Sequence, residues 1–492
     1  MWTNESLQEL IREKLQDYMF VVVSNRQPYV HSWKQSRIVV NRGAGGVVTA
    51  LDPILQTCSG LWVAWGNGDA DKKASPSATL AVPPENPSYT LRRIWLTKQE
   101  EIGYYYGFSN EALWPLCHTA FNRPIFRRED WETYVRVNEK FADAVAEELH
   151  GRRAFVWIQD YHLCLLAKML KERLPEQVIT AHFWHIPWPG HDTFRICPNR
   201  RELLDGLLAN DLLGFHIQHH CNNFIDTVDR ELESKIDRER HSIVRGGHET
   251  LIRPFPISVD YQDIEKRCKT PELSEMSKQL SDEFGLEGKK VLLGLDRIDY
   301  TKGIPERLLA VDRLLDKHPE LSEKFIFLQM GEISRLHIPK YKQLNDEINA
   351  LVEQINWKHS TDSWKPITLI RRHLNYPQPL AFYVLGDVCV VSSLHDGMNL
   401  VAKEYVSSVD ESKGTLVLSQ FTGAARELSD ALLVNPYDRE EFADSLYTAI
   451  TMPEEERRHR MQKMKAAVSH QNIYRWAGKV ISELLKLEFV EK

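Results

Sequence analysis

The chain has 492 residues, of which 42% are hydrophobic and 27% are charged, and its formal net charge is −7. These values are typical of a globular protein with two or three domains. Lysine and arginine are spread along the sequence instead of clustering, which argues against a nucleic-acid-binding protein. No apolar run approaches the ~18 residues that span a bilayer. Seven dispersed cysteines without a C-x-x-C pair favour reduced thiols and a cytoplasmic location over a disulfide framework or a structural zinc site.

The first half of the chain alternates short apolar runs with helical stretches. The first twenty residues mix charge with leucine, so they predict an amphipathic helix and not a signal peptide. Further helices are expected at 141–149 and 200–208. The predicted strands are 19–24, 154–159, 178–183 and 212–216.

The second half repeats this alternation. Its predicted strands are 290–295, 325–329, 367–370, 387–392, 415–419 and 431–434. Apolar strands separated by helices are typical of parallel sheets covered on both faces. Two such series predict an α/β fold with two doubly wound, Rossmann-like domains facing across a cleft. The proline-containing stretch 253–260 is the expected linker, and the predicted divisions are 1–256, 257–472 and a final helix, 473–492, that returns to the first domain.

Residues 393–406 are the most informative stretch of the sequence. They follow a predicted strand and lead through a glycine-containing polar loop into a helix that begins near Leu400. Backbone N–H groups at such a helix N-terminus point at an anion. Glu404 lies one turn into this helix on the face of Leu400, where its carboxylate can accept two ribose hydroxyls. The pattern predicts a nucleotide-sugar site, with helix capping as the alternative role of Asp396 and Asn399.

Two cations follow the strand at 290–295. Arg297 and Lys302 share one loop at the carboxyl end of this strand, where ligands of open α/β sheets bind. A pair of cations suits the two phosphates of a nucleoside diphosphate and stabilises charge that develops on a leaving group. The alternative interpretation is surface ion pairing with Asp296 and Asp299.

The first domain offers its own anion-binding groups. Arg26 follows the first predicted strand, and a glycine loop with Gly43, Gly45 and Gly46 opens a helix. Glycines let the backbone approach a phosphate. The loop matches neither G-x-G-x-x-G nor G-x-x-x-x-G-K-[ST], so a dinucleotide site or a P-loop is not indicated.

Polar and aromatic residues follow the next two strands. Asp160 and His185 stand at the ends of neighbouring predicted strands, and aromatic residues flank the histidine. Tyr105 and Trp114 belong to further aromatic stretches, for which core packing is the alternative. Aromatic rings beside polar groups suit the face of a sugar. The sequence lacks a G-x-S-x-G elbow and an H-E-x-x-H motif, so it predicts neither a serine hydrolase nor a metalloprotease.

From about residue 20 to residue 480 these motifs together resemble the trehalose-6-phosphate synthase family, retaining glycosyltransferases of the GT-B type. The motifs that carry the resemblance are Ser24-Asn-Arg26, the glycine loop, Tyr105 with Gly107-Phe-Ser-Asn110, Leu113-Trp-Pro115, Gln159-Asp-Tyr-His162, His185-Ile-Pro187, Arg297-Ile-Asp-Tyr-Thr-Lys302, Asp396-Gly-Met-Asn-Leu-Val-Ala-Lys-Glu404 and Asn435-Pro-Tyr437.

The resemblance implies a role for each matching residue. The first domain would bind glucose 6-phosphate and the second a nucleoside-diphosphate glucose. The implied acceptor residues are Arg26, Tyr105 and Arg335 for the phosphate, and Trp114 and Asp160 for the sugar. The implied donor residues are Gly45, Gly46, His185, Arg297, Lys302, Asp396, Met398, Asn399, Leu400, Val401 and Glu404. The implied catalytic residues are Asp160, His185, Arg297 and Lys302.

The implied reaction moves glucose from UDP-, ADP- or GDP-glucose to glucose 6-phosphate with retention, giving α,α-trehalose 6-phosphate and a nucleoside diphosphate. No carboxylate is placed as an obvious covalent nucleophile, so a double displacement is not suggested. The leaving phosphate would accept the acceptor's proton on the same face of the sugar. No metal or cofactor is implied, nor a nucleic-acid or membrane partner; a homo-oligomer is possible.

Two departures from the family pattern bear on the donor. His395 stands where the family commonly has arginine, and Leu374 aligns with a phenylalanine that the family places against the base, so the base preference stays open. The competing hypotheses are a glucosylglycerol-phosphate synthase, a glycogen-synthase-like enzyme or sugar-nucleotide epimerase, and a catalytically silent regulatory subunit that binds sugar phosphate.

Overall fold

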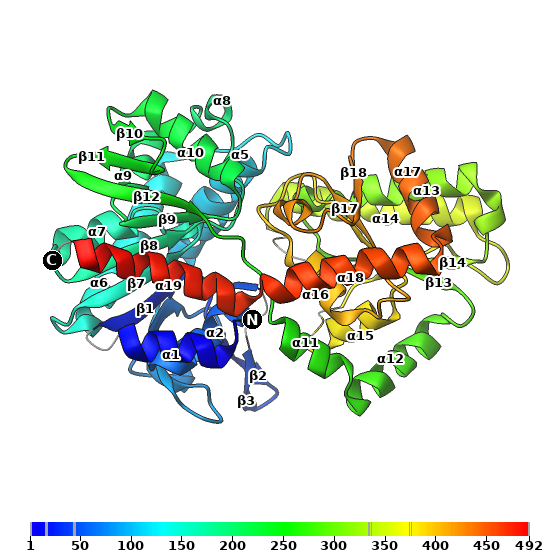
Figure 1. Cartoon of the computed structure of the whole chain (residues 1–492), viewed down its shortest axis with the longest axis horizontal. Coiled ribbons are helices and arrows are strands. Elements are labelled where there is room, and N and C mark those ends of the chain that lie inside the picture. The colour runs from blue at the N-terminus through cyan, green and yellow to red at the C-terminus, as the bar shows by residue number, and fades with distance from the viewer. Residues whose placement is uncertain are drawn as a thin grey trace. The chain divides into compact units, whose positions relative to one another are not determined.

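The computed structural model in Figure 1 describes residues 2–14, 18–42, 46–332, 335, 337–372, 374 and 376–490. The chain forms two compact units. The first combines Trp2–Ile257 with Ile473–Lys492, and the second is Ser258–Asn472. Across the described ranges, no helix is both long and apolar enough to cross a membrane.

A ten-stranded sheet organises the first unit, in the order β10-β11-β12-β9-β8-β7-β1-β4-β6-β5. Its strands are β1 (Met19–Ser24), β4 (Leu61–Trp65), β5 (Thr79–Val82), β6 (Tyr89–Ile94), β7 (Ala154–Gln159), β8 (Val178–Phe183), β9 (Leu212–Phe215), β10 (Lys235–Asp237), β11 (Ser242–Arg245) and β12 (His248–Pro254). The central strands are parallel, and the order reverses between β1 and β7. This reversal is a topological switch point, where open α/β sheets bind ligands.

The helices of the first unit connect these strands. They are α1 (Asn4–Lys14), α2 (Gly46–Cys58), α3 (Asp71–Ala74), α4 (Lys98–Glu100), the π-helix η1 (Glu101–Leu113), α5 (Trp114–His118), α6 (Arg128–Leu149), η2 (Tyr161–Leu163), α7 (Leu166–Arg173), α8 (His191–Phe194), α9 (Arg200–Leu207), α10 (Gln218–Glu231) and α19 (Ile473–Val490). The four strands predicted from the first half of the sequence are β1, β7, β8 and β9.

The sequence prediction missed the edges of this sheet. β10, β11 and β12 pair antiparallel with one another, and so do β5 and β6. The separate hairpin of β2 (Tyr29–Lys34) and β3 (Arg37–Arg42) was also missed. These strands carry charged and half-exposed side chains, so they lack the continuous apolar runs that identify buried parallel strands. Strand β4 was missed as well, although its five residues are buried and it pairs parallel with β1.

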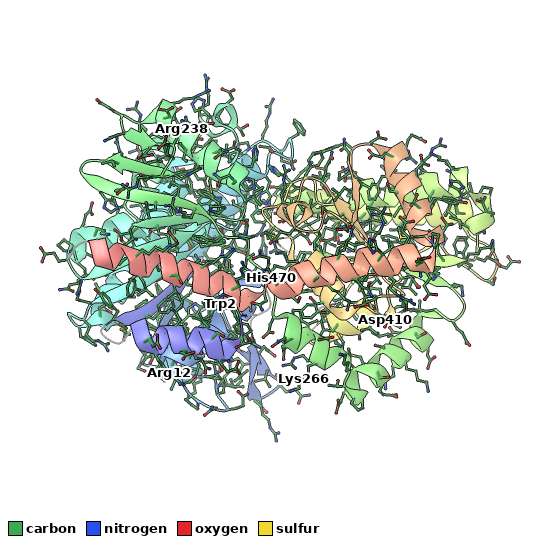
Figure 2. The ribbon with its side chains drawn as sticks, viewed as in Figure 1. Trp2, Arg12, Arg238, Lys266, Asp410 and His470 are labelled. Atoms are coloured by element: carbon green, nitrogen blue, oxygen red, sulfur yellow. The ribbon has the colours of Figure 1, made fainter. Side chains whose placement is uncertain are left out.

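Helix α19 belongs to the first unit. The Trp476 ring lies 4.9 Å from that of Trp157 on β7 and 5.2 Å from that of Phe183 on β8. At the start of the chain, Trp2 lies against the same helix (Figure 2). A Cβ added at Gly478 would come within 2.5 Å of the Trp2 ring, so this close approach requires glycine.

The second unit contains a six-stranded parallel sheet in the order β15-β14-β13-β16-β17-β18. Its strands are β13 (Lys290–Arg297), β14 (Phe325–Glu332), β15 (Ile367–Ile370), β16 (Val388–Val391), β17 (Thr415–Ser419) and β18 (Leu432–Val434). All six were predicted from the sequence. The strand order reverses between β13 and β16, which makes their carboxyl ends the switch point of this unit.

Helices cover both faces of this sheet (Figure 1). They are α11 (Tyr261–Cys268), α12 (Pro271–Phe284), η3 (Tyr300–Lys302), α13 (Ile304–Lys317), η4 (Pro319–Leu321), α14 (Pro339–His359), α15 (Gln378–Leu385), α16 (Leu400–Ser408), η5 (Gly423–Arg426), α17 (Arg439–Thr451) and α18 (Glu454–His470). Helix α16 begins at Leu400, as its sequence predicted.

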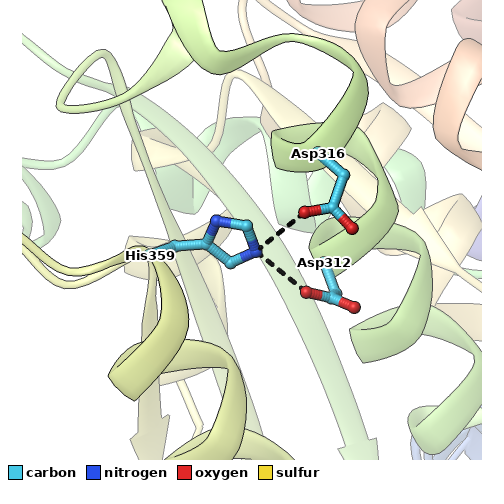
Figure 3. Close-up of side chains that lie close together, drawn as sticks. All are labelled: Asp312, Asp316 and His359. Atoms are coloured by element: carbon cyan, nitrogen blue, oxygen red, sulfur yellow. Dashed lines mark hydrogen bonds and ion pairs between the residues drawn. The ribbon is translucent and has the colours of Figure 1, made fainter.

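A cluster of charged side chains joins three of these helices. Asp312, Asp316 and His359 place possible metal-ligand atoms within 4.8 Å of one another, and His359 Nε2 lies 2.8 Å from Asp312 Oδ1 (Figure 3). Lys358 Nζ, however, lies 2.9 Å from Asp312 Oδ1 and 2.7 Å from Asp316 Oδ2. Arg439 Nη2 is 2.6 Å from Asp312 Oδ2. Two cations already neutralise the two carboxylates, so we interpret the cluster as an ion-pair network that ties α13 to α14 and α17.

We expect Asp312→Asn to lower the free energy of unfolding by about 1–3 kcal/mol, because Asp312 bonds to three partners that lose a charged acceptor. Asp316→Asn is the matched control: Asp316 is 31% exposed against 14% for Asp312, so its loss should stay below about 1 kcal/mol. Denaturant unfolding followed by circular dichroism measures both. EDTA should leave the wild-type transition unchanged, and a clear downward shift would show that the cluster holds a metal.

Candidate active site

The switch point of the second unit brings together the predicted cations and the loop at 393–399. Arg297 ends β13, Lys302 lies in η3, and Asp396 follows β16. Lys302 Nζ stands 2.6 Å from Asp396 Oδ2, with both side chains under one-fifth exposed. Burial lowers the pKa of Lys302, but the carboxylates of Asp396 and Asp296 outweigh it and raise the pKa. Lys302 is therefore a fixed positive charge where β13 and β16 end.

The neighbouring carboxylate of Asp296 is not a surface ion-pair partner of Arg297 and Lys302. Asp296 is buried and pairs with the equally buried Arg307, whose Nη2 lies 2.6 Å from Asp296 Oδ2. Arg307 also donates to Ser392 Oγ at 2.9 Å. The surface ion pairing considered from the sequence does not describe Asp296, which instead helps to fix β13 against β16.

The loop before α16 is held by its own side chains. Ser393 Oγ donates to Asp396 Oδ2 at 3.2 Å, and Asn399 Nδ2 approaches the same oxygen at 3.3 Å. Asn399 has a φ of 92° and caps α16, because its Oδ1 accepts the Ala402 N–H at 3.1 Å. The capping alternative is thus right for Asn399 and wrong for Asp396, whose carboxylate pairs with Lys302 instead.

Gly303 lets the two loops approach each other. It adopts a φ of +59°, and a Cβ there would meet the Ser392 carbonyl oxygen at 2.2 Å. Ser392 Oγ donates back to the Gly303 carbonyl at 2.8 Å. Any L side chain at this position would be strained by both conformation and contact, so glycine is what lets η3 lie against the end of β16.

The first turn of α16 carries the remaining donor candidates. Met398 is buried just before the helix, and its carbonyl accepts the Ala424 N–H at 2.9 Å. Leu400 and Val401 are half-buried at the helix N-terminus. Glu404 is half-buried one turn later, where Tyr383 Oη donates to its Oε2 at 3.0 Å. Burial raises the pKa of Glu404 to about 7, and the Tyr383 hydrogen bond only partly opposes this shift.

Arg335, predicted to bind a phosphate, lies in this second unit. Its side chain is 6% exposed, its φ is +53°, and it follows β14. Its Nη1 donates to Tyr341 Oη at 2.7 Å and stands 3.4 Å from Asp299 Oδ2. The Asp299 carboxylate and the Tyr341 hydroxyl therefore orient the guanidinium, and neither was predicted from the sequence as a partner of Arg335.

The first unit places Asp160 and His185 at the ends of the paired strands β7 and β8. Asp160 has a φ of 69° and a ψ of 175°, a region that only glycine populates readily and that marks functional sites when another residue occupies it. Its Oδ1 accepts the backbone N–H of His185 at 3.1 Å, and His185 Nε2 lies 2.8 Å from Gln159 Oε1. Burial lowers the pKa of His185 to about 3, and repulsion between the protonated forms of His185 and His182 adds to this effect. The His185 ring is thus neutral near pH 7.

Aromatic contacts connect Tyr105 and Trp114 to the Asp160 loop. The Tyr105 ring stacks on His162 at 5.9 Å, and the Trp114 ring lies 5.8 Å from that of Tyr161. Asn110 fixes the π-helix η1 between them: its Nδ2 donates to the Tyr105 carbonyl at 2.6 Å, and its Oδ1 accepts the Tyr161 hydroxyl at 3.1 Å. The structure therefore gathers Tyr105, Trp114 and Asp160 around one turn.

Arg26 and Gly46 are the remaining candidates of the first unit, and Gly43 lies outside the described residues. Arg26 is exposed beyond the end of β1, and its carbonyl accepts a hydrogen bond from Ser24 Oγ at 2.6 Å. Strand β1 pairs with both β7 and β4, so Arg26 emerges at the switch point. Gly45 lies outside the described residues. Gly46 begins helix α2, as predicted for a loop that opens a helix.

Several residues that support the site were missed in the sequence. The buried positions of Tyr341 and Tyr383 on α14 and α15 look like ordinary core tyrosines in a single sequence. Asn110 was visible only as part of a motif, because the π-helix that gives it a role has no simple sequence period. Asp299 stood between two predicted cations and was considered only as their ion-pair partner, in the alternative interpretation. The missing signal in each case was a contact across elements distant in the sequence.

Comparison with known proteins decides the family. The model of glycosyltransferase family 20 matches residues 18–486. The chain belongs to this family. It is 36% identical over 480 residues to the trehalose-6-phosphate synthase of Mycolicibacterium vanbaalenii, covering 96% of this chain and 97% of that protein. The predicted resemblance is thereby confirmed.

Two solved structures are similar to the whole of this family 20 chain. A structure from E. coli bound with UDP-2-fluoro glucose has a TM-score of 0.84 and 32% identity, covering 95% of this chain and 99% of that one. A UDP-forming α,α-trehalose-phosphate synthase from Burkholderia xenovorans in complex with glucose-6-phosphate has a TM-score of 0.84 and 30% identity, covering 94% and 99%. These similarities confirm the predicted fold class of two Rossmann-like domains.

The raised pKa of Glu404 predicts a pH-dependent stability. Because the folded pKa of about 7 exceeds the value of ~4.3 in an unfolded chain, the protonated form is favoured on folding. The wild type should therefore lose stability relative to Glu404→Gln as the pH rises from about 4.5 to 7, by roughly 1–3 kcal/mol, with no further change above this range. Denaturant unfolding at pH 5, 6, 7 and 8 measures the difference. A pH-independent difference would contradict the burial argument. Tyr383→Phe should extend the window upward, since it removes the hydrogen bond that lowers the pKa.

Proposed function

We propose that this family 20 chain transfers glucose from UDP-glucose to glucose 6-phosphate with retention, giving α,α-trehalose 6-phosphate and UDP. The single observation that carries the proposal is the Lys302–Asp396 pair at the β13–β16 switch point, which presents a fixed cation beside the N-terminus of α16. A cation and a helix N-terminus at one place suit a diphosphate. The names of two relatives, one bound with UDP-2-fluoro glucose and one described as UDP-forming, favour uridine as the base.

The second unit would supply most of the donor ligands. Arg297 and Lys302 would bind the diphosphate, and Asp396 with Asn399 would contact the glucose. Glu404 would accept the ribose hydroxyls from the first turns of α16, near Met398, Leu400 and Val401. The family resemblance also assigns Gly45, Gly46 and His185 to the donor.

The acceptor would bind through its phosphate and its sugar ring separately. Arg26, Tyr105 and Arg335 are the proposed phosphate ligands, since two guanidinium groups and a phenol supply strong donors. Trp114 and Asp160 are the proposed sugar contacts. The positive φ of Asp160 supports its assignment, because strain of this kind is retained where a side chain must be aimed precisely. The structure of a relative in complex with glucose-6-phosphate favours this acceptor over glycerol phosphate.

The chemistry would rest on positioning and charge stabilisation. With a pKa of about 3, His185 is unprotonated and a weak base near pH 7, which fits a reaction in which the leaving phosphate takes the proton of the acceptor hydroxyl. Arg297 and Lys302 would stabilise the charge that develops on this phosphate. We also propose a cytoplasmic location, which the odd number of dispersed cysteines favours.

An activity panel with the purified protein tests the proposed function. UDP-, ADP- and GDP-glucose are each offered with glucose 6-phosphate, glucose or glycerol 3-phosphate, and the released nucleoside diphosphate is measured. We expect the highest rate with UDP-glucose and glucose 6-phosphate, and NMR should identify an α,α-linked product. Release with glycerol 3-phosphate alone would assign another acceptor, and no release with any pair would indicate a silent sugar-phosphate-binding subunit.

Lys302→Ala should lower kcat/KM about hundredfold, by analogy with the ~3 kcal/mol lost when one donor to a developing anion is removed. Lys290→Ala is the matched control, because Lys290 begins β13, at the end of the strand remote from Lys302, and pairs with Asp387 at 3.0 Å. We expect the control to retain activity within about threefold. Steady-state kinetics measures both variants. Full activity of Lys302→Ala would refute the assignment of Lys302 to the diphosphate.

A further inference from the structure

Asp299 occupies an unusual position in the loop that follows β13. It lies between Arg297 and Lys302, which the proposed function assigns to the donor diphosphate, yet its own carboxylate turns to other partners. The side chain is 1% exposed. Its Oδ1 accepts the backbone N–H of Thr301 at 3.0 Å and the Thr301 hydroxyl at 2.9 Å. One oxygen therefore fixes the conformation of the loop.

The second oxygen of Asp299 reaches Arg335. Tyr341 Oη donates to Asp299 Oδ2 at 3.0 Å and accepts a hydrogen bond from Arg335 Nη1 at 2.7 Å. Arg335 Nη1 also stands 3.4 Å from the same oxygen, and its Cζ lies 5.5 Å from the centre of the Tyr341 ring. The carboxylate, the phenol and the guanidinium thus form a closed triangle in the interior of the second unit.

Charge keeps this triangle intact near neutral pH. Burial raises the pKa of the Asp299 carboxyl, but the positive charges of Arg335 and then Arg297 outweigh burial and hold the pKa below its ordinary value. An ionised carboxylate with both oxygens used is a firm anchor for a guanidinium. Arg335 also needs an anchor, because it lies in a left-handed backbone conformation beyond the end of β14.

We propose that Asp299 is a positioning residue that holds Arg335 for the acceptor phosphate and thereby links this arginine to the loop that binds the donor diphosphate. The inference rests on the proposed function and deepens it. One loop carries Arg297 and Lys302 and, through Asp299, orients Arg335. Ordering of this loop by a diphosphate therefore orders a phosphate ligand of the acceptor as well. Affinity for a phosphorylated acceptor should depend on Asp299 even though Asp299 touches neither substrate.

Asp299→Asn is the sharpest variant, because asparagine keeps an oxygen for the Thr301 N–H and removes the charge that holds Arg335. Tyr341→Phe removes the other support of Arg335. The matched control is Asp410→Asn. Asp410 makes the same local contacts, accepting the Ser412 N–H at 2.9 Å and the Ser412 hydroxyl at 2.5 Å, but it lies beyond the C-terminal end of α16 (Figure 2).

The decisive readout is the preference for a phosphorylated acceptor, measured as the ratio of kcat/KM for glucose 6-phosphate to that for glucose. We expect Asp299→Asn to lower this ratio by about tenfold or more, as is common when a residue supporting a ligand contact is removed, mainly through a higher KM. Tyr341→Phe should lower it less, and Asp410→Asn should not change it. The affinity for UDP alone, measured by calorimetry, should stay within about threefold of the wild type in all variants. A variant that keeps the wild-type ratio should also keep the wild-type melting temperature.

Two kinetic outcomes would overturn the inference. If Asp299→Asn keeps the wild-type ratio while Arg335→Ala loses it, Arg335 does not need Asp299. If Arg335→Ala also keeps the ratio, neither residue serves the acceptor phosphate, although transfer by the wild type would still stand. Should the wild type release no nucleoside diphosphate, the proposed function fails by itself. In that case the affinity for glucose 6-phosphate is measured by calorimetry in the presence of UDP. If Asp299→Asn binds glucose 6-phosphate as tightly as the wild type, the proposed role of Asp299 is refuted.

Discussion

The ion pair between Lys302 and Asp396 is the interaction on which the second unit's site depends. It joins the loop after β13 to the loop after β16, and these two strands flank the point where the strand order reverses. At a reversal the connections leave in opposite directions, so the strand ends stay open. The salt bridge closes part of this opening while leaving a cation and a helix N-terminus beside each other. Lys302 is thus fixed by structure before any anion arrives.

Further buried ion pairs surround the Lys302–Asp396 pair. Arg307 and Asp296 are almost fully buried and serve the packing of β13 against β16. Asp299 and Arg335 are nearly as buried, but their contact joins the loop after β13, which we propose to bind the diphosphate, to a residue proposed to bind the acceptor. Removing one partner of such a pair leaves an uncompensated charge in a low dielectric. These ion pairs therefore couple the loops after β13, β14 and β16, because a shift of one loop would break an ion pair with another.

The first unit achieves its geometry by other means. Its Asp160 turn holds a backbone conformation that disfavours every residue except glycine, and aromatic rings from η1 and η2 pack beside it. Rings stacked at these distances resist deformation and so support the strained turn. A neutral His185 donates its backbone N–H to Asp160, so hydrogen bonds and packed rings hold these residues of the first unit in place.

The sequence by itself determined the class of fold and the placement of the main candidates. Continuous apolar runs identified all six strands of the second sheet, and chemistry-bearing residues after strands had to lie at one edge, because parallel strands end together. Only the tertiary structure decided the edge strands, the π-helix and the partners of each charge. Asp396 was open to interpretation as a helix cap until Asn399 was seen to fill that place. Asp299 and Arg335 are 36 positions apart, and no local period connects them. Pairings of this kind depend on which strand ends the sheet order brings together, and a single sequence does not contain that order explicitly.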